Sequence, residues 1–218
     1  MRRKNFLAAI IVVLIGLVAV PMASSAQELS VGADIVSSYI WRGAKFGEGA
    51  SVQPTVEFSS GGFAIGAWGA FDLSDDEYAE ADLYMGYGVG GFYVGLTDYF
   101  FPVYQGEHPE YFDYDNHGLE LNLSYEAGPV TISANRFLSD SMEDDMYFEL
   151  AFSVGPASIF IGAGDESYTE DGDFALCNLG ITGEKEIQIT DSFSLPVFAS
   201  FIVNPDIEQA YMVFGMSF

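Results

Sequence analysis

Acidic side chains recur between apolar neighbours along this chain of 218 residues. Glu120, for example, lies between two leucines, and Glu57 lies between a valine and a phenylalanine. Because successive side chains of a β-strand point to opposite faces, such carboxylates would share the face opposite the apolar one. The candidates for this common face are Asp34, Glu57, Glu80, Asp82, Glu120 and Glu149, with Arg42 as the basic member. Around a hydrated space, these carboxylates would create a negative field that favours cations over anions.

Residues with catalytic potential are sparse. The only histidines are His108 and His117, and His117 beside Asp115 could form an Asp–His set with a serine elsewhere. No paired motif accompanies it, so we expect no enzyme. The single cysteine, Cys177, has no histidine near it and is expected to fill a lipid-facing position. The segment 165–173 has the oxygen-rich composition of a calcium loop without its spacing, so we expect no metal site and no cofactor.

The elements that must position these residues are strands. From Leu29 to Phe218 the sequence alternates apolar with polar or small residues in twelve segments, punctuated by Gly and Pro, and shows no helical period. An even number of antiparallel strands is typical of single-chain outer-membrane barrels. A soluble sandwich or a secreted barrel would share the alternation, so the connections must distinguish these classes.

The connections fall into two sets. Every second one is short, at 59–62, 88–91, 127–129 and 155–156, and the one around Glu184–Ser192 is expected to be longer. The intervening loops and adjoining strand ends contain 22 of the 32 acids. Short turns at one rim and long loops at the other are typical of the outer membrane, and a sandwich has no reason to sort its loops in this way. We predict a transmembrane antiparallel up-and-down β-barrel of about 12 strands with both termini periplasmic.

The beginning of the chain predicts export. Three basic residues precede the apolar run Phe6–Val20, and the small residues Ala23–Ala26 follow it. This pattern predicts a signal peptide over 1–26 rather than a membrane anchor, with the barrel over 27–218. The remaining chain has four basic residues against 32 acids, which argues against nucleic acid as a partner.

The end of the chain is an alternating segment, Ala210–Phe218, that stops on an aromatic residue. Phe214, Met216 and Phe218 share its apolar parity, as in the terminal strands that direct outer-membrane proteins into the membrane. We expect these three residues to be the membrane-assembly signal. Other aromatic residues at strand ends, Tyr39 and Trp41 among them, are expected at the membrane interfaces.

A resemblance to a known family supports the prediction of an outer-membrane barrel. The stretch Val36–Gly43, followed by Ser51–Pro54 and Gly62–Gly69, resembles the TorF family of porin-like proteins, including its "YxxRG" element. The similarity extends from about Leu29 to Phe218. It implies an outer-membrane location and a barrel, and says little about the solute. Arg42 and Gly43 would be structural there, with Gly43 permitting a bend and Arg42 pairing with nearby acids.

Two functions fit these observations. The first is a porin that passes small solutes or ions, with a cation preference set by the inward carboxylates. The second is a closed structural or surface-binding barrel, filled by side chains and the loop Asp98–Asn116, that acts through its acidic outer loops. Expected partners are outer-membrane lipid, lipopolysaccharide and the barrel-assembly machinery, together with small solutes or cations.

Overall fold

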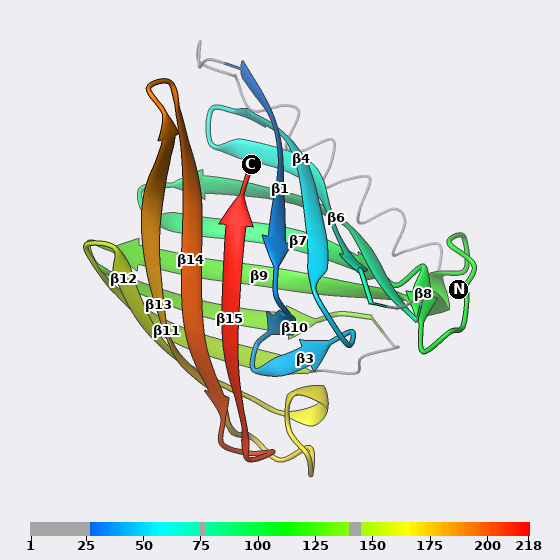
Figure 1. Ribbon diagram of the computed structural model, residues 1–218. Helices are drawn as coiled ribbons and strands as arrows, with labels where there is room; N and C mark the ends of the chain where they lie inside the picture. Colours follow the sequence, from blue (N-terminus) through cyan, green and yellow to red (C-terminus); the bar gives the residue numbers. More distant parts are fainter. Residues whose placement is uncertain (1–26, 75–76, 140–144) are drawn as a thin grey trace.

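The computed structural model describes residues 27–74, 77–139 and 145–218. The predicted signal peptide, residues 1–26, lies outside the described residues, as do parts of two acidic loops at 75–76 and 140–144. No helix within the described part has the length and apolar character needed to cross a membrane. The architecture is all-β (Figure 1).

Twelve long strands of the described chain form one closed antiparallel barrel. In chain order they are β1 (Gln27–Val36), β4 (Ser51–Ser60), β5 (Phe63–Asp72), β6 (Tyr78–Val89), β7 (Phe92–Phe100), β9 (His117–Ala127), β10 (Val130–Phe137), β11 (Met146–Val154), β12 (Ala157–Gly164), β13 (Ala175–Thr190), β14 (Phe193–Asn204) and β15 (Gln209–Ser217). Each pairs with the next, and β15 returns to β1, where Ala33 and Phe218 exchange backbone hydrogen bonds. The prediction of a 12-stranded up-and-down barrel is confirmed.

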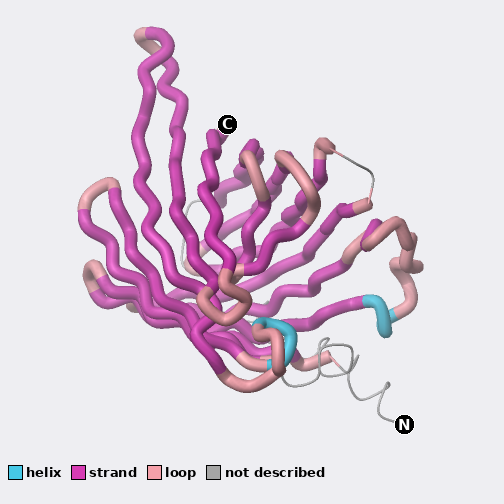
Figure 2. The backbone as a smooth tube through the Cα atoms, turned by 60° about the horizontal axis from the view of Figure 1, so that its bottom comes forward, coloured by secondary structure: helices cyan, strands magenta, loops and turns pink. Residues whose placement is uncertain are grey.

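The short connections share the rim at which β15 ends, because every strand is antiparallel to its neighbours. Gly61 and Gly62 join β4 to β5 with φ angles of 59° and 89°, the left-handed conformation that a tight two-residue hairpin requires. The longer connection predicted around Glu184–Ser192 is wrong. The two strands continue to a pairing of Thr190 with Phe193, so a tall β13–β14 hairpin protrudes from this rim (Figure 2).

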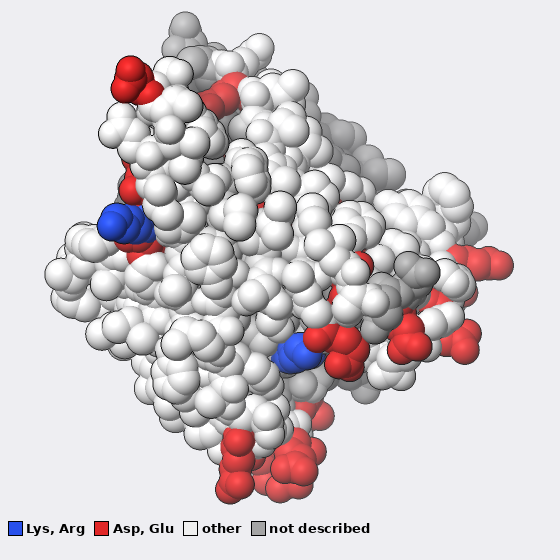
Figure 3. All heavy atoms as spheres, viewed as in Figure 1, with Lys and Arg blue, Asp and Glu red and all other residues white. Residues whose placement is uncertain are grey.

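The outer wall is apolar. Leu29, Val31 and Met212 are 70%, 76% and 72% exposed, and leucine, isoleucine, valine and phenylalanine side chains continue the exposed surface around most strands. Figure 3 shows this wall almost free of charge, with acids gathered mainly at the long-loop end. The alternating pattern therefore places its apolar parity outside and its polar parity inside, as expected from the sequence.

The first strand is shorter than its sequence pattern predicts. β1 ends at Val36, and the chain then forms a separate hairpin from β2 (Tyr39–Trp41) and β3 (Ala44–Phe46) before it enters β4. Tyr39 is only 8% exposed and packs against Trp68 and Tyr78, which point into the barrel. The prediction that Tyr39 and Trp41 lie at a membrane interface is wrong, because the hairpin folds inward.

The other long connections carry short elements at the opposite rim. The β7–β9 connection contains β8 (Val103–Tyr104), which pairs with β6, and the helical turn η1 (Tyr114–Asn116). Phe112 in this loop is 88% exposed, so the segment that the closed-barrel alternative would place in the lumen lies at the rim. The β12–β13 connection contains a second helical turn, η2 (Glu166–Tyr168), whose Tyr168 is buried (Figure 2).

Candidate functional site

The turn of the β2–β3 hairpin carries Arg42 into the barrel. Trp41 pairs with Ala44, so Arg42 and Gly43 form a two-residue turn with φ angles of 50° and 84°. Both angles lie in the left-handed region, which is costly for arginine and suits glycine. A β-carbon at Gly43 would collide with the carbonyl oxygen of Cys177 on β13. The hairpin tip therefore lies against the barrel wall.

A bidentate ion pair with Glu120 holds Arg42 in place. Its two terminal nitrogens donate to the Glu120 carboxylate on β9 at 2.5 and 3.0 Å, and the two side chains are 12% and 0% exposed. The Tyr99 hydroxyl donates to the same carboxylate at 3.0 Å, and the Asn122 amide donates at 2.6 Å. A bidentate pair with further hydrogen bonds is the arrangement that stabilises a buried carboxylate. Glu120 is therefore an anchor for Arg42.

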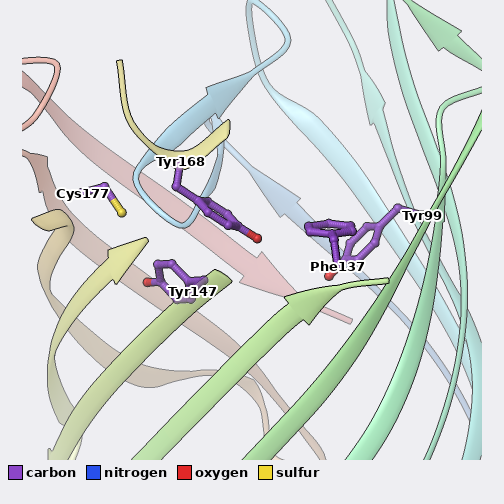
Figure 4. Packing of buried hydrophobic residues seen from close by; sticks show 5 residues of the cluster. All are labelled: Tyr99, Phe137, Tyr147, Tyr168 and Cys177. Atoms are coloured by element: carbon purple, nitrogen blue, oxygen red, sulfur yellow. The ribbon is translucent and has the colours of Figure 1, made fainter. Parts of the chain in front are cut away.

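Aromatic rings surround the guanidinium. Its central carbon lies 4.4, 4.6 and 5.5 Å from the ring centroids of Trp41, Tyr147 and Tyr168, within the range of cation–π attraction. Tyr147 comes from β11 and Tyr168 from η2, and Figure 4 shows the two rings close together beside Cys177. The Tyr168 hydroxyl accepts from Arg42 at 2.5 Å and donates to Glu120 at 3.3 Å. Burial raises the pKa of Tyr168 although the Arg42 cation opposes this, so the phenol stays a neutral donor.

The other face of the hairpin contacts the opposite wall. The Tyr39 ring lies 5.5 Å from Trp68 on β5 and 6.2 Å from Tyr78 on β6, and Phe46 lies 5.5 Å from Tyr78. On the remaining side, the Asn204 amide of β14 donates to the Gly43 carbonyl at 3.2 Å. Contacts with β5, β6, β9, β11, β13 and β14 mean that the hairpin spans the lumen and obstructs it at this level.

Two cavities adjoin the hairpin. The larger, of about 340 Å³, is lined by polar groups that include Asn122, Ser133 and Asn135. The smaller, of about 130 Å³, is lined by Asn178 and by the apolar residues Ile40, Phe160 and Ile202. Arg42 and Glu149 line both. Polar and apolar groups therefore line both cavities beside the hairpin.

The remaining acids predicted to face the lumen are distributed around the wall. Glu57 accepts a hydrogen bond from the Tyr84 hydroxyl at 2.9 Å, and Glu149 accepts one from the Tyr147 hydroxyl at 2.6 Å. Asp34 lies opposite Gln53 in the β1–β4 register. The structure thus brings Arg42 and Glu120 together and places Glu149 beside them.

Glu80 and Asp82 occupy the β6 wall, where they are 3% and 4% exposed. The Tyr78 hydroxyl donates to Glu80, and the backbone N–H of Phe100 donates to Asp82 at 3.4 Å. Both carboxyls therefore lie in a nearly dry part of the wall. Neither of them lines the two cavities that Glu149 lines.

The position of the Cys177 side chain and the partners of His117 were not anticipated from the sequence. Cys177 is fully buried against the inner aromatic residues, so the predicted lipid-facing position is wrong. Gly162 pairs with Asn178 and Ala163 with Leu176, so Cys177 is the extra residue of a β-bulge, which reverses its direction. His117 pairs with Asp98 at 3.0 Å, and its other nitrogen lies 2.6 Å from the Tyr111 carbonyl oxygen. The first contact joins β7 to β9, and the second ties the β7–β9 loop to the barrel.

Asp72 fixes the return of the hairpin at the long-loop rim. Its carboxylate accepts from the backbone of Glu48, Gly49 and Ser74 and from the Ser74 hydroxyl, at 2.5 to 3.0 Å. Slight burial raises the pKa of Asp72, but these hydrogen bonds outweigh it and lower the pKa to about 2. In the part of the chain that the structure describes, no cluster of three or more His, Cys, Asp or Glu side chains is placed to hold a metal ion.

Comparison with known proteins identifies the family. A family model described as "Bacterial protein of unknown function (Gcw_chp)" matches residues 21–182, which include the β2–β3 hairpin. The chain belongs to this family. The TorF name is not part of that description and stays a prediction for this Gcw_chp member.

One solved structure with a similar fold is a multiply substituted variant of the Rh. blastica porin. It is 14% identical over 77% of this chain and 55% of the porin, with a TM-score of 0.42, so the chain spans about half the length of that porin. No curated protein matches the sequence.

Proposed function

We propose that this protein is an outer-membrane β-barrel that passes small ions or solutes, with a preference for cations, through a lumen narrowed by the β2–β3 hairpin. The observation that carries the proposal is that the barrel wall separates apolar side chains from polar ones. Large apolar residues cover the outside, and polar or charged residues face the inside. Soluble monomers rarely expose a continuous apolar surface of this kind, whereas barrels in the outer membrane require one.

The charges inside the barrel support the cation preference. Glu57 and Glu149 face inward with tyrosine donors as partners, so they keep a negative field in the lumen. In the described ranges, the one largely buried basic side chain is that of Arg42, and Glu120 offsets its charge. Lys45, Arg136 and Lys185 are exposed. A cation approaching the interior would therefore meet a net attraction.

The hairpin argues for a narrow passage. It contacts opposite walls and holds a buried ion pair, so the open diameter of an unobstructed 12-stranded barrel is not available at this level. Barrels with a lumen plugged by their own segments are a known variant of the architecture. We infer low conductance when the hairpin is docked and higher conductance when it is displaced.

A permanently closed barrel is the second candidate, and the same hairpin favours it. In that case the acidic loops at the long-loop rim would act as the binding surface, with divalent cations bridging them to lipopolysaccharide phosphates. Under either candidate we propose that lipid surrounds the apolar wall and that the barrel-assembly machinery recognises the Phe214, Met216 and Phe218 end. We do not propose an enzymatic role.

Reversal potentials in planar bilayers test the channel proposal. Under a KCl gradient, the purified barrel is expected to give small currents that reverse near the potassium potential. Glu57→Gln and Glu149→Gln should each move the reversal potential toward zero, because each removes one inward charge. An anion-selective current would contradict the charge argument, and folded protein without any current would favour the closed barrel.

A further inference from the structure

We propose that Glu149 and Asn178 form a binding site for a small primary alkylammonium cation inside the barrel, next to Arg42. The site deepens the proposed function, on which it rests because the ligand must enter the lumen. Its two residues come from β11 and β13, which flank β12, and both line the cavity of about 130 Å³.

Asn178 provides the first acceptor. Its amide nitrogen donates to the Tyr147 hydroxyl oxygen at 2.8 Å and to a Glu149 carboxylate oxygen at 3.2 Å. A carboxylate accepts only, so these bonds fix the orientation of the amide and leave its carbonyl oxygen for another partner. That oxygen is buried and has no hydrogen-bond partner among the described residues, and the residue is 5% exposed. An unpaired buried acceptor is costly, so this oxygen marks a place for a donor.

Glu149 provides the second acceptor and the negative charge. The Tyr147 hydroxyl donates to one of its oxygens at 2.6 Å, and the Asn178 amide donates to the same oxygen. These neutral donors hold the carboxylate in position without cancelling its charge. Arg42 is directed at Glu120 through both terminal nitrogens. The pair of acceptors therefore selects a ligand that donates N–H bonds and carries a positive charge.

The cavity limits the size and shape of this ligand. A volume of about 130 Å³ corresponds to about four water molecules at roughly 30 Å³ each. Ile40, Phe160 and Ile202 line the same cavity and supply apolar contacts. A primary ammonium group with a short alkyl chain, such as n-propylammonium, satisfies both the acceptors and the apolar wall. Its neutral analogue n-propanol matches the shape but lacks the charge.

Ligand binding to the folded barrel in detergent micelles tests the site. n-Propylammonium chloride is titrated while saturation-transfer NMR reports its contact with the protein, and n-propanol is titrated in parallel. Glu149→Gln preserves an acceptor for Tyr147 and Asn178, so the barrel should fold, and heat-modifiable gel mobility checks this. We expect Glu149→Gln and Asn178→Ala each to weaken ammonium binding about tenfold or more, since each removes one acceptor of the cation.

Glu57→Gln is the matched control. Glu57 is also an inward carboxylate with a tyrosine donor, but it lines neither cavity, so this variant should weaken ammonium binding far less than Glu149→Gln does. Absence of wild-type binding, binding of n-propanol as tight as that of the ammonium, or equal losses in Glu57→Gln and Glu149→Gln would overturn the proposal. The assay needs no membrane current. Binding without conductance would contradict the channel alone, and a cation-selective current without binding would contradict this site alone.

Discussion

Replacing Arg42 by methionine tests whether the hairpin is anchored by its ion pair. The change keeps an unbranched stem and removes the charge, so the fully buried Glu120 carboxylate loses its bidentate partner. Removing one member of a buried, hydrogen-bonded pair costs about 3–5 kcal/mol, because the other charge stays buried. Tyr99, Asn122 and Tyr168 still donate to Glu120, which places the expected loss toward the lower end. A loss of about 3 kcal/mol weakens hairpin docking by about two orders of magnitude.

Lys45→Met on the same hairpin is the matched control. Lys45 lies 3.9 Å from Glu48, and these side chains are 34% and 78% exposed, so this pair contributes at most about 1 kcal/mol. Both variants change one basic residue of one hairpin to the same side chain. Arg42→Met removes a buried pair together with the ring contacts of the guanidinium, whereas Lys45→Met removes an exposed pair and a hydrogen bond to the Glu48 carbonyl.

Trp41 reports hairpin docking directly. The chain has two tryptophans, and Trp68→Phe leaves Trp41 as the single tryptophan, which is excited selectively, while keeping an aromatic ring against Tyr39. Acrylamide quenching along a urea titration gives the concentration at which Trp41 becomes accessible, and gel mobility verifies that the barrel is still folded. We expect Arg42→Met to lower this concentration clearly and Lys45→Met to leave it unchanged. Identical titrations for the two variants would refute the anchoring role of the Arg42–Glu120 pair.

Three further perturbations have defined outcomes. Gly43→Ala should destabilise hairpin docking by about 1–3 kcal/mol in the Trp41 assay, because alanine is strained at a φ of 84° and its β-carbon would meet the Cys177 carbonyl. Unchanged docking would show that the hairpin tip does not lie on β13. Asp72 has a pKa of about 2 against an ordinary value of about 3.9, so its stabilisation of the rim is present above about pH 4 and is lost as the pH falls through about 2. Amide NMR of Glu48 and Gly49 should show this acid transition in the wild type and not in Asp72→Asn. Phe218→Ala should reduce the amount of protein in the outer-membrane fraction more than it lowers the unfolding midpoint of refolded barrel, whereas Phe201→Ala, another exposed aromatic change, should leave assembly normal.

The barrel could be predicted from the sequence because the signals for its strands and turns lie within short segments of the chain. Alternation with period 2 indicates each strand and its two faces, and paired glycines such as Gly61 and Gly62 indicate tight turns. Once twelve such segments alternate with short and long connections, antiparallel pairing of neighbours leaves one closed arrangement. Because neighbouring strands are antiparallel, successive connections alternate between the two rims, so the short turns share one rim and the long loops share the other.

The inserted hairpin could not be predicted in this way. Tyr39 and Trp41 continue the parity of the first strand, so the pattern extends past Val36 although the chain turns inward at Ser37 and Ser38. Arg42 and Glu120 are separated by 78 residues, and the pairing of His117 with Asp98 also depends on neighbouring strands. Cys177 needed knowledge of a bulge, since one extra residue reverses the face of a side chain. The expectation that Arg42 pairs with acids named the chemistry but not the partner.

Single-channel conductance of the wild type and of a hairpin-excised barrel tests whether the hairpin narrows a cation-selective lumen. In the excised barrel a short Gly–Ser linker replaces residues 38–47, and gel mobility verifies the fold. We predict small, cation-selective currents in the wild type and larger currents of the same selectivity without the hairpin. A folded, hairpin-free barrel that carries no current, or that prefers anions, would contradict it.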